Sequence, residues 1–166
     1  MASLRNIRFL VIDDNPHTLQ ILRAVLNGLE GQHIQAAHNA AQAIGLLHET
    51  KVDIVILDIQ LETESGLDVL AKIRADPDQS IAFLPVIMLS GHSDLSGVQL
   101  ARDAGANEFC SKPVVPAALL RKIVAVIERP RPFVRAGGYF GPERRRKVDP
   151  DYDGPERRAE KAVLEA

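Results

Sequence analysis

Cysteine is nearly absent from this sequence, because Cys110 is the single one in 166 residues. One thiol excludes an internal disulfide framework, and it cannot hold a metal ion by itself. A chain without disulfides fits a reducing compartment. Long apolar runs are missing as well. No stretch reaches the roughly 18 to 20 consecutive apolar residues of a membrane span, and the run Phe9–Ile12 is too short for a signal-peptide core. From these absences we expect a cytoplasmic protein.

Basic charge is scarce in the first part of the chain and concentrated at its end. Residues 1–129 carry 11 basic and 15 acidic side chains, a net charge of −4, whereas residues 130–166 carry 9 and 7, a net charge of +2. With 46% apolar residues, the chain is long enough for one full hydrophobic core. We therefore expect one domain over residues 1–129 and a basic tail over residues 130–166 that has an anionic partner.

Short apolar runs alternate with helical periodicity through the first 129 residues. Asn15 followed by Pro16 is typical of a helix start, and the apolar run from Val52 to Leu57 is typical of a strand buried on both faces. The expected strands are 9–12, 33–37, 52–57, 85–89 and 108–111, and the expected helices begin at Pro16, occupy 40–49, 66–75 and 95–103, and begin again at Pro116. Five such units indicate an α/β fold with a doubly wound, five-stranded parallel sheet.

Polar residues stand directly after four of the expected strands. Asp13 and Asp14 follow the first, Asp58 the third, Ser90 the fourth and Lys112 the fifth. Because ligands collect beyond the carboxyl ends of parallel strands, we expect these side chains to converge. Three carboxylates in one place favour a hard cation such as Mg²⁺. A carboxylate is also a nucleophile toward phosphorus, and Mg²⁺, an ammonium and a hydroxyl would stabilise that transfer. Taken singly, each residue is also ordinary for a helix cap or a turn.

The whole set of motifs resembles a response-regulator receiver domain of the CheY type, over residues 5–128. The motifs are Asp13-Asp14, Asp58 with Gly66 eight residues later, Ser90-Gly91, and Phe109 three residues before Lys112-Pro113. The resemblance implies a flavodoxin-like sheet of strand order 2-1-3-4-5 and a histidine kinase or phosphotransfer protein as the phosphoryl donor. It implies a domain that catalyses its own phosphorylation and dephosphorylation, not an enzyme that acts on a separate substrate.

The resemblance also assigns a metal site. It implies that Asp58 is the phosphoacceptor and binds the metal, that Asp14 binds Mg²⁺ directly, and that Asp13 binds it largely through water. The backbone carbonyl of Gln60 would be a further ligand. Two positions depart from or vary within the family pattern: Glu62 stands where many relatives have proline, and Gln60 is at a position that sets the lifetime of the phosphoryl group.

A switch is implied on the other side of the phosphoacceptor. Ser90 and Lys112 would contact the phosphoryl group, and Phe109 would rotate into the space that Ser90 leaves as it moves inward. His92 is the second position that sets the phosphoryl lifetime. The Lys112-Pro113 peptide would be cis.

One short phrase occurs twice in the basic tail. Tyr-x-Gly-Pro-Glu-Arg-Arg begins at Tyr139 and again at Tyr152. Gly-Pro is typical of a turn followed by a helix start, so we expect a largely irregular tail in which each copy begins a short helical segment. Only 37 residues follow Arg129, and they have too few apolar side chains for a core, so we expect no DNA-binding or catalytic output domain.

Arginine pairs beside a tyrosine suit a guanine nucleotide with two phosphates, because guanidinium groups bind phosphate, read guanine and stack on bases. The tail also resembles the arginine-rich C-terminal extension of CheY-like proteins that bind cyclic di-GMP and act on the flagellar motor switch. A solvated, disordered tail and a docking peptide for an acidic protein surface remain alternatives, and nucleic-acid binding would be weak and non-specific. The candidate cyclic di-GMP residues are Arg131, Arg135, Tyr139, Arg144, Arg145, Arg146, Tyr152, Arg157 and Arg158.

Overall fold

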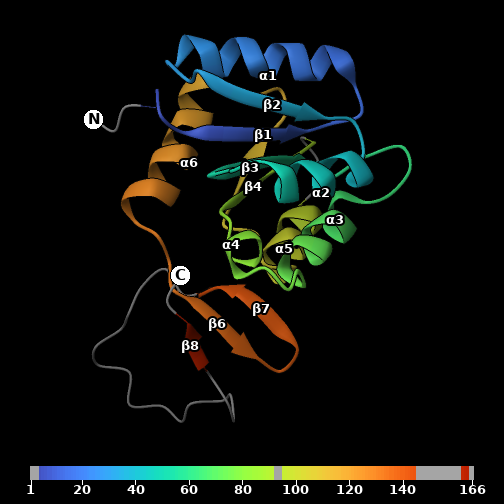
Figure 1. Ribbon diagram of the computed structural model, residues 1–166, viewed down its shortest axis with the longest axis vertical. Helices are drawn as coiled ribbons and strands as arrows, with labels where there is room; N and C mark the ends of the chain where they lie inside the picture. Colours follow the sequence, from blue (N-terminus) through green and yellow to red (C-terminus); the bar gives the residue numbers. More distant parts are fainter. Residues whose placement is uncertain (1–3, 92–94, 145–161, 165–166) are drawn as a thin grey trace.

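A central sheet of five parallel strands, in the order β2-β1-β3-β4-β5, organises the molecule (Figure 1). The computed structural model describes residues 4–91, 95–144 and 162–164, and for 95–97 and 162–164 it describes the backbone alone. The strands are β1 (Arg8–Ile12), β2 (His33–Ala37), β3 (Ile54–Asp58), β4 (Val86–Ser90) and β5 (Glu108–Ser111). The doubly wound, flavodoxin-like sheet expected from the sequence is confirmed.

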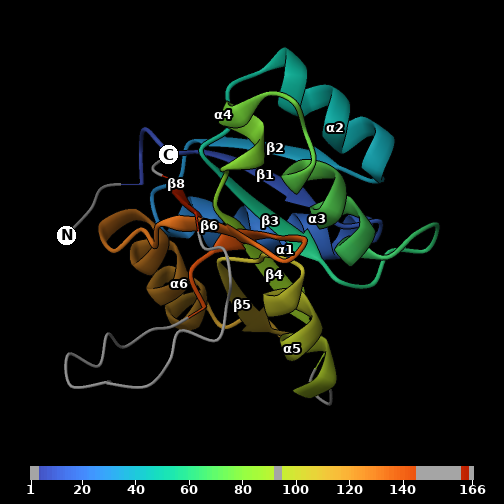
Figure 2. The same cartoon turned by 90° about the horizontal axis from the view of Figure 1, so that it is seen from below.

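Helices cover both faces of this sheet. One layer is α1 (Pro16–Gly28) and α6 (Pro116–Glu128), and the other is α2 (Ala40–Glu49), α3 (Gly66–Arg74) and α5 (Leu95–Asp103). Figure 2 shows the two layers from below. Successive residues of β1 face opposite layers, because Phe9 and Val11 join the core under α1 and α6 while Leu10 and Ile12 join the other. Every residue of β3 and β4 is buried, as the continuous apolar runs predict.

The helix α1 begins at the capping residues that the sequence predicts. The Asn15 side chain accepts a hydrogen bond from the backbone N–H of His17 at 2.9 Å, and Pro16 occupies the first turn of α1. A short helix, α4 (Gln79–Ala82), was not expected from the sequence.

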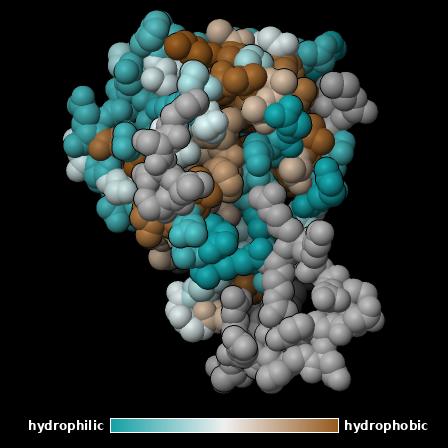
Figure 3. All heavy atoms as spheres, turned by 180° about the vertical axis from the view of Figure 1, so that it is seen from behind, coloured by the Kyte–Doolittle hydropathy of each residue, from teal (hydrophilic) through white to brown (hydrophobic). Residues whose placement is uncertain are grey.

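Among the helices in the described part of the chain, none has the length and apolar character to cross a membrane. On the face seen in Figure 3, apolar side chains gather in the upper half among hydrophilic ones.

The start of the tail is a β-hairpin, which the expectation of a largely irregular tail did not include; residues 145–161 lie outside the described residues. Its strands are β6 (Phe133–Ala136) and β7 (Tyr139–Pro142), and β8 (Ala162–Leu164) pairs with the other edge of β6. Gly137 and Gly138 form the turn with φ of 52° and 81°, which other residues rarely adopt. The expected helix start in the first repeat is wrong, because Gly141 and Pro142 pair with β6 as part of β7.

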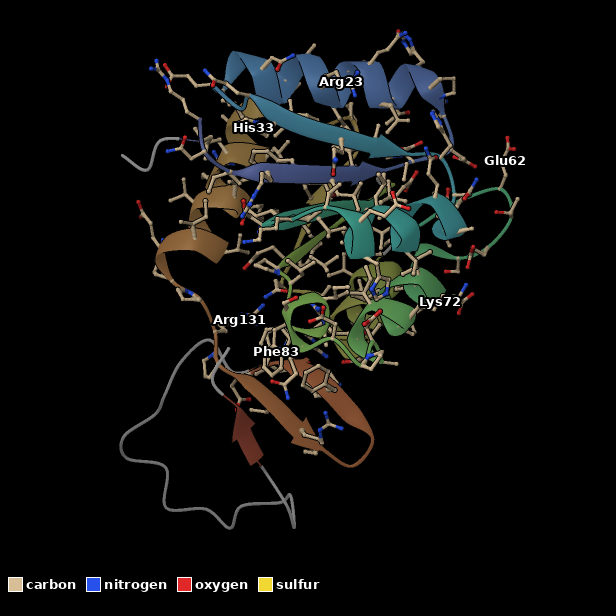
Figure 4. All side chains as sticks on the ribbon, viewed as in Figure 1. Arg23, His33, Glu62, Lys72, Phe83 and Arg131 are labelled. Carbon is tan, nitrogen blue, oxygen red and sulfur yellow. The ribbon has the colours of Figure 1, made fainter. Side chains whose placement is uncertain are left out.

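The hairpin packs against the N-terminal ends of β4 and β5. Phe133 is 4% exposed, and its ring lies 4.8 Å from that of Phe83 and 5.5 Å from that of Phe140, between ring centroids. Figure 4 shows Phe83 directly above the hairpin. A Cβ on Gly141 would lie 2.7 Å from the Cα of Gly105, so this close approach requires glycine. The hairpin is therefore anchored at the end of the sheet opposite to the carboxyl ends of its strands.

A buried arginine lies beneath the hairpin. Arg74, 7% exposed, donates to the backbone carbonyls of Ala82, Leu84 and Gly105 at 2.8 to 3.0 Å and to the side chain of Asn107 at 2.9 Å. Its guanidinium also lies 5.0 Å from the centre of the Phe133 ring. Burial lowers the pKa of Arg74 to about 9. The side chain ties the end of α3 to the starts of β4 and β5.

Candidate functional site

Four of the predicted site residues meet where the parallel strands end. Asp58 and Ser90 are the last residues of β3 and β4, while Asp13 and Lys112 directly follow β1 and β5. The strands are parallel, so their carboxyl ends lie side by side at one edge of the sheet. Asp58 pairs with Leu89 and is therefore next to Ser90. Asp13, Asp58 and Ser90 are 1%, 6% and 4% exposed, and carboxylates are almost never so deeply buried unless they are paired.

The ammonium group of Lys112 lies between two of the carboxylates. It donates to Asp13 Oδ2 at 3.0 Å and to Asp58 Oδ2. Burial acts to lower the pKa of Lys112, but the bonds to Asp58 and Asp13 outweigh it and raise that pKa above its ordinary value. Burial also raises the pKa of the Asp58 carboxyl, against the effect of the Lys112 bond. The site therefore holds a positive charge against buried carboxylates, as the sequence predicted.

Backbone N–H groups orient the carboxylates. The N–H of Gln60 donates to Asp58 Oδ1 at 3.1 Å, and the N–H of Asn15 donates to Asp13 Oδ1 at 2.8 Å. The predicted Gly66 has a clear steric reason. A Cβ there would lie 1.9 Å from the backbone oxygen of Asp58, so glycine lets α3 start directly against the end of β3.

Asp14 points to a different partner. Its Oδ2 accepts a hydrogen bond from the backbone N–H of Glu62, in the loop after β3. Sequence reasoning noted Glu62 as a departure from the family pattern but missed this contact. Within the described residues, no three carboxylate, imidazole or thiolate side chains are grouped as a metal site.

The donor chemistry nevertheless fits a magnesium ion. Mg²⁺ takes oxygen ligands and usually keeps several waters, so it needs only one or two carboxylates from the protein. Asp13 and Asp58 already hold a cation, the ammonium of Lys112. The residues that would hold Mg²⁺ directly are Asp14, Asp58 and the backbone carbonyl of Gln60, while Asp13 would bind it largely through water.

Of the implied switch residues, Ser90 lies next to the acidic group, and Phe109 pairs with Met88 of β4, two residues before Ser90. Phe109 is half-buried on β5, and the ammonium of Lys122 lies 5.1 Å from the centre of its ring. The backbone carbonyl of Ser90 accepts from the N–H of Lys112 at 2.7 Å. The Lys112-Pro113 peptide is cis, as predicted. The rotation of Phe109 stays a prediction, and His92 lies outside the described residues.

The described part of the tail does not form a free arginine cluster. Arg144 stacks 4.0 Å from the centre of the Tyr139 ring and pairs with Asp103 at 3.3 Å, while Arg135 lies 4.8 Å from the centre of the Phe140 ring. The Tyr139 hydroxyl donates to the carbonyl of Pro142 at 2.7 Å. Arg131, on the linker labelled in Figure 4, donates to the backbone carbonyls of Asn107 and Glu143. The other candidates lie outside the described residues: Arg145, Arg146, Tyr152, Arg157 and Arg158.

Comparisons with known proteins agree with this geometry. The family model described as "Response regulator receiver domain" matches residues 9–124. The DNA-binding response regulator MtrA of Mycolicibacterium smegmatis is 33% identical over 122 residues, which are 74% of this chain and 51% of MtrA. A putative response regulator from Chloroflexus aurantiacus J-10-fl has a similar structure, with a TM-score of 0.68 and 26% identity over 75% of this chain and 100% of that one.

A CheY-like receiver domain protein from Methanospirillum hungatei JF-1 is also similar, with a TM-score of 0.64 and 25% identity over 74% of this chain and 94% of that one. The chain belongs to the response regulator receiver domain family. It spans about half the length of MtrA, so the activity of that whole protein does not pass to this chain by similarity alone.

Proposed function

We propose that this chain is a phosphoryl acceptor of a two-component system and that Asp58 is the acceptor residue. Response regulators interact with histidine kinases or phosphotransfer proteins. One observation carries the proposal. The buried carboxylate of Asp58 lies at the carboxyl end of the sheet, within hydrogen-bond reach of the partly buried ammonium of Lys112. That pair supplies a nucleophile and a positive group for the phosphoryl oxygens.

The chemistry follows from these positions. An oxygen of Asp58 attacks the phosphorus of a phosphohistidine, the P–N bond breaks as the P–O bond forms, and the imidazole leaves with a proton from water. The bond between Gln60 N–H and Asp58 Oδ1 fixes the carboxylate for this attack. Lys112 then exchanges its Asp58 contact for a phosphoryl oxygen, and the hydroxyl of Ser90 lies at the adjacent strand end to donate to another. Receiver domains generally bind Mg²⁺, which when bound neutralises charge on the transferred group.

Phosphorylation of the intact chain tests the proposal. The protein is incubated with acetyl phosphate or a phosphorylated histidine kinase, with and without Mg²⁺, and the phosphorylated form is separated on a phosphate-affinity gel. We expect one acid-stable, base-labile phosphoryl group that requires Mg²⁺ and is lost in Asp58→Asn. Asp53→Asn is a matched control at the opposite end of β3, and it should be phosphorylated normally. Equal phosphorylation of Asp58→Asn and the wild type would refute Asp58 as the acceptor.

The finer part of the proposal concerns the tail, which we propose binds cyclic di-GMP and so controls a partner such as the flagellar motor switch. The duplicated phrase and its arginines support it. The contacts of Arg131 with Asn107 and of Arg144 with Asp103 mean that these two arginines would have to exchange existing partners for a ligand. The second copy is therefore the better place to test.

Calorimetry with cyclic di-GMP should compare the intact chain with the double variant Arg157→Ala, Arg158→Ala. Truncation at Arg129 would be a poor comparison, because it removes the packed hairpin as well. Heat from the wild type that is lost in the double variant supports the proposal. No heat from either, together with binding of an acidic protein partner, would favour the alternative of a phosphorylation-only adaptor or phosphorelay protein whose tail docks that partner.

A further inference from the structure

The loop between β3 and α3 is closed on itself and tied to the helix that follows. Gln60 and Ser65 pair as an isolated antiparallel bridge at its base. On its far side, the carboxylate of Glu64 forms an ion pair with the ammonium of Lys72 at 2.6 Å. These contacts hold residues 61–64 as a short arch beyond the end of β3. Figure 4 shows Glu62 on this arch, at the right, and Lys72 on α3 below it.

The tip of this arch reaches across to the loop after β1. The backbone N–H of Glu62 donates to Oδ2 of Asp14, which is 48 residues earlier in the sequence. Asp13, by contrast, is oriented by its own loop, through the N–H of Asn15. Asp13 and Asp14 are thus held by different parts of the chain. Of these two, Asp14 is the one whose orientation depends on the loop that contains Gln60.

We infer that Glu62 is a positioning residue for the metal ion: its backbone N–H orients the carboxylate of Asp14 for Mg²⁺. The inference rests on the proposed function, in which Asp14 is a metal ligand. A carboxylate with one oxygen held by a fixed donor cannot rotate freely, so the direction of its other oxygen is set before the metal arrives. Hydrogen-bond partners of ligating groups typically contribute 10- to 100-fold to metal affinity.

Residue 62 has two separable effects on this site. Its N–H acts through Asp14, and its exposed carboxylate adds a negative charge to the loop after β3. Glutamine at this position keeps the N–H and removes the charge, whereas proline removes both. The charge effect is screened by salt, while a direct hydrogen bond to a partly buried carboxylate is much less so. A pair of substitutions at two salt concentrations therefore resolves the two effects.

The experiment measures the Kd for Mg²⁺ by calorimetry in the full chain. Glu62→Gln should weaken binding by about two- to threefold at low salt, and by less at about 0.5 M salt. Glu62→Pro should bind about tenfold more weakly than Glu62→Gln at both salt concentrations. Equal Kd values for Glu62→Pro and Glu62→Gln would overturn the inference while the proposed function stands. No Mg²⁺ binding by the wild type would instead overturn the metal site on which both rest.

Amide NMR of the wild type gives a second test that does not depend on how proline affects the loop. The N–H of Glu62 should be shifted downfield and protected from exchange, and it should stay so when Mg²⁺ saturates the site. Asp14→Ala should remove both properties while the Gln60 and Ser65 amides keep their shifts. A Glu62 amide that behaves alike in the wild type and in Asp14→Ala, or that loses its hydrogen bond when Mg²⁺ binds, would refute the positioning role.

Discussion

Replacing Phe133 by alanine tests whether the hairpin is an integral part of the folded domain. The ring contacts those of Phe83 and Phe140 and lies 5.0 Å from the guanidinium of Arg74. Truncating a buried phenylalanine costs about 3 to 5 kcal/mol. The hairpin lies at one end of the molecule, so the loss should not exceed the free energy of docking it on the domain. We therefore expect a loss of about 3 kcal/mol, and a fall of about 6 to 12 °C in Tm.

Urea unfolding followed by far-UV circular dichroism measures this loss. The slope of the unfolding free energy against urea concentration should be the same in the wild type and the variant, which shows that the unfolded state has not changed. Arg135→Ala is the matched control, because Arg135 is an exposed residue of the same strand that loses only its stacking on Phe140. We expect that control to lose less than about 1 kcal/mol. A loss for Phe133→Ala no larger than that of the control would refute the reasoning and would mean that the hairpin does not stabilise the domain.

Three further predictions concern other parts of the fold. Arg74→Met leaves three buried carbonyls without their donor, so it should lose about 2 to 3 kcal/mol in the same urea assay. Gly66→Ala places a methyl group against the backbone of Asp58, so it should reduce both stability, by about 2 kcal/mol, and phosphorylation on a phosphate-affinity gel. The hydrogen bonds from Arg8 lower the pKa of Asp53, so the stability they contribute is present above the unfolded pKa of about 3.9 and is lost as the pH falls below it. The unfolding free energy of the wild type should therefore fall more steeply than that of Asp53→Asn between about pH 5 and 2, and equal slopes would contradict this.

Local patterns were enough to predict the sheet and the acidic site. The apolar runs that became β3 and β4 are continuous because both faces of these strands are buried. Once the sheet is parallel, its strand ends share one edge, so the positions of Asp58 and Lys112 in the sequence imply that they meet. The contact between Glu62 and Asp14 carried no such signal, because it joins the tips of two loops.

The hairpin did carry a local signal, which was overlooked. Gly137-Gly138 between two short apolar runs is typical of a two-residue hairpin turn. Pro130 and Pro132 lie between the end of α6 and the start of β6, so they separate two regular elements and do not end regular structure.

By itself, the sequence determined the family, the residues at the strand ends, and the order of the five parallel strands and of the helices between them, apart from the short α4. These follow from periodicity and from residue types at fixed offsets, which depend on neighbours along the chain. Only the tertiary structure decided that Phe133 docks on Phe83, that Arg74 is enclosed by carbonyls, and that Arg131 and Arg144 of the tail bond to the domain. Those arrangements depend on packing between segments far apart in the chain, where many partners of similar chemistry compete and shape selects one.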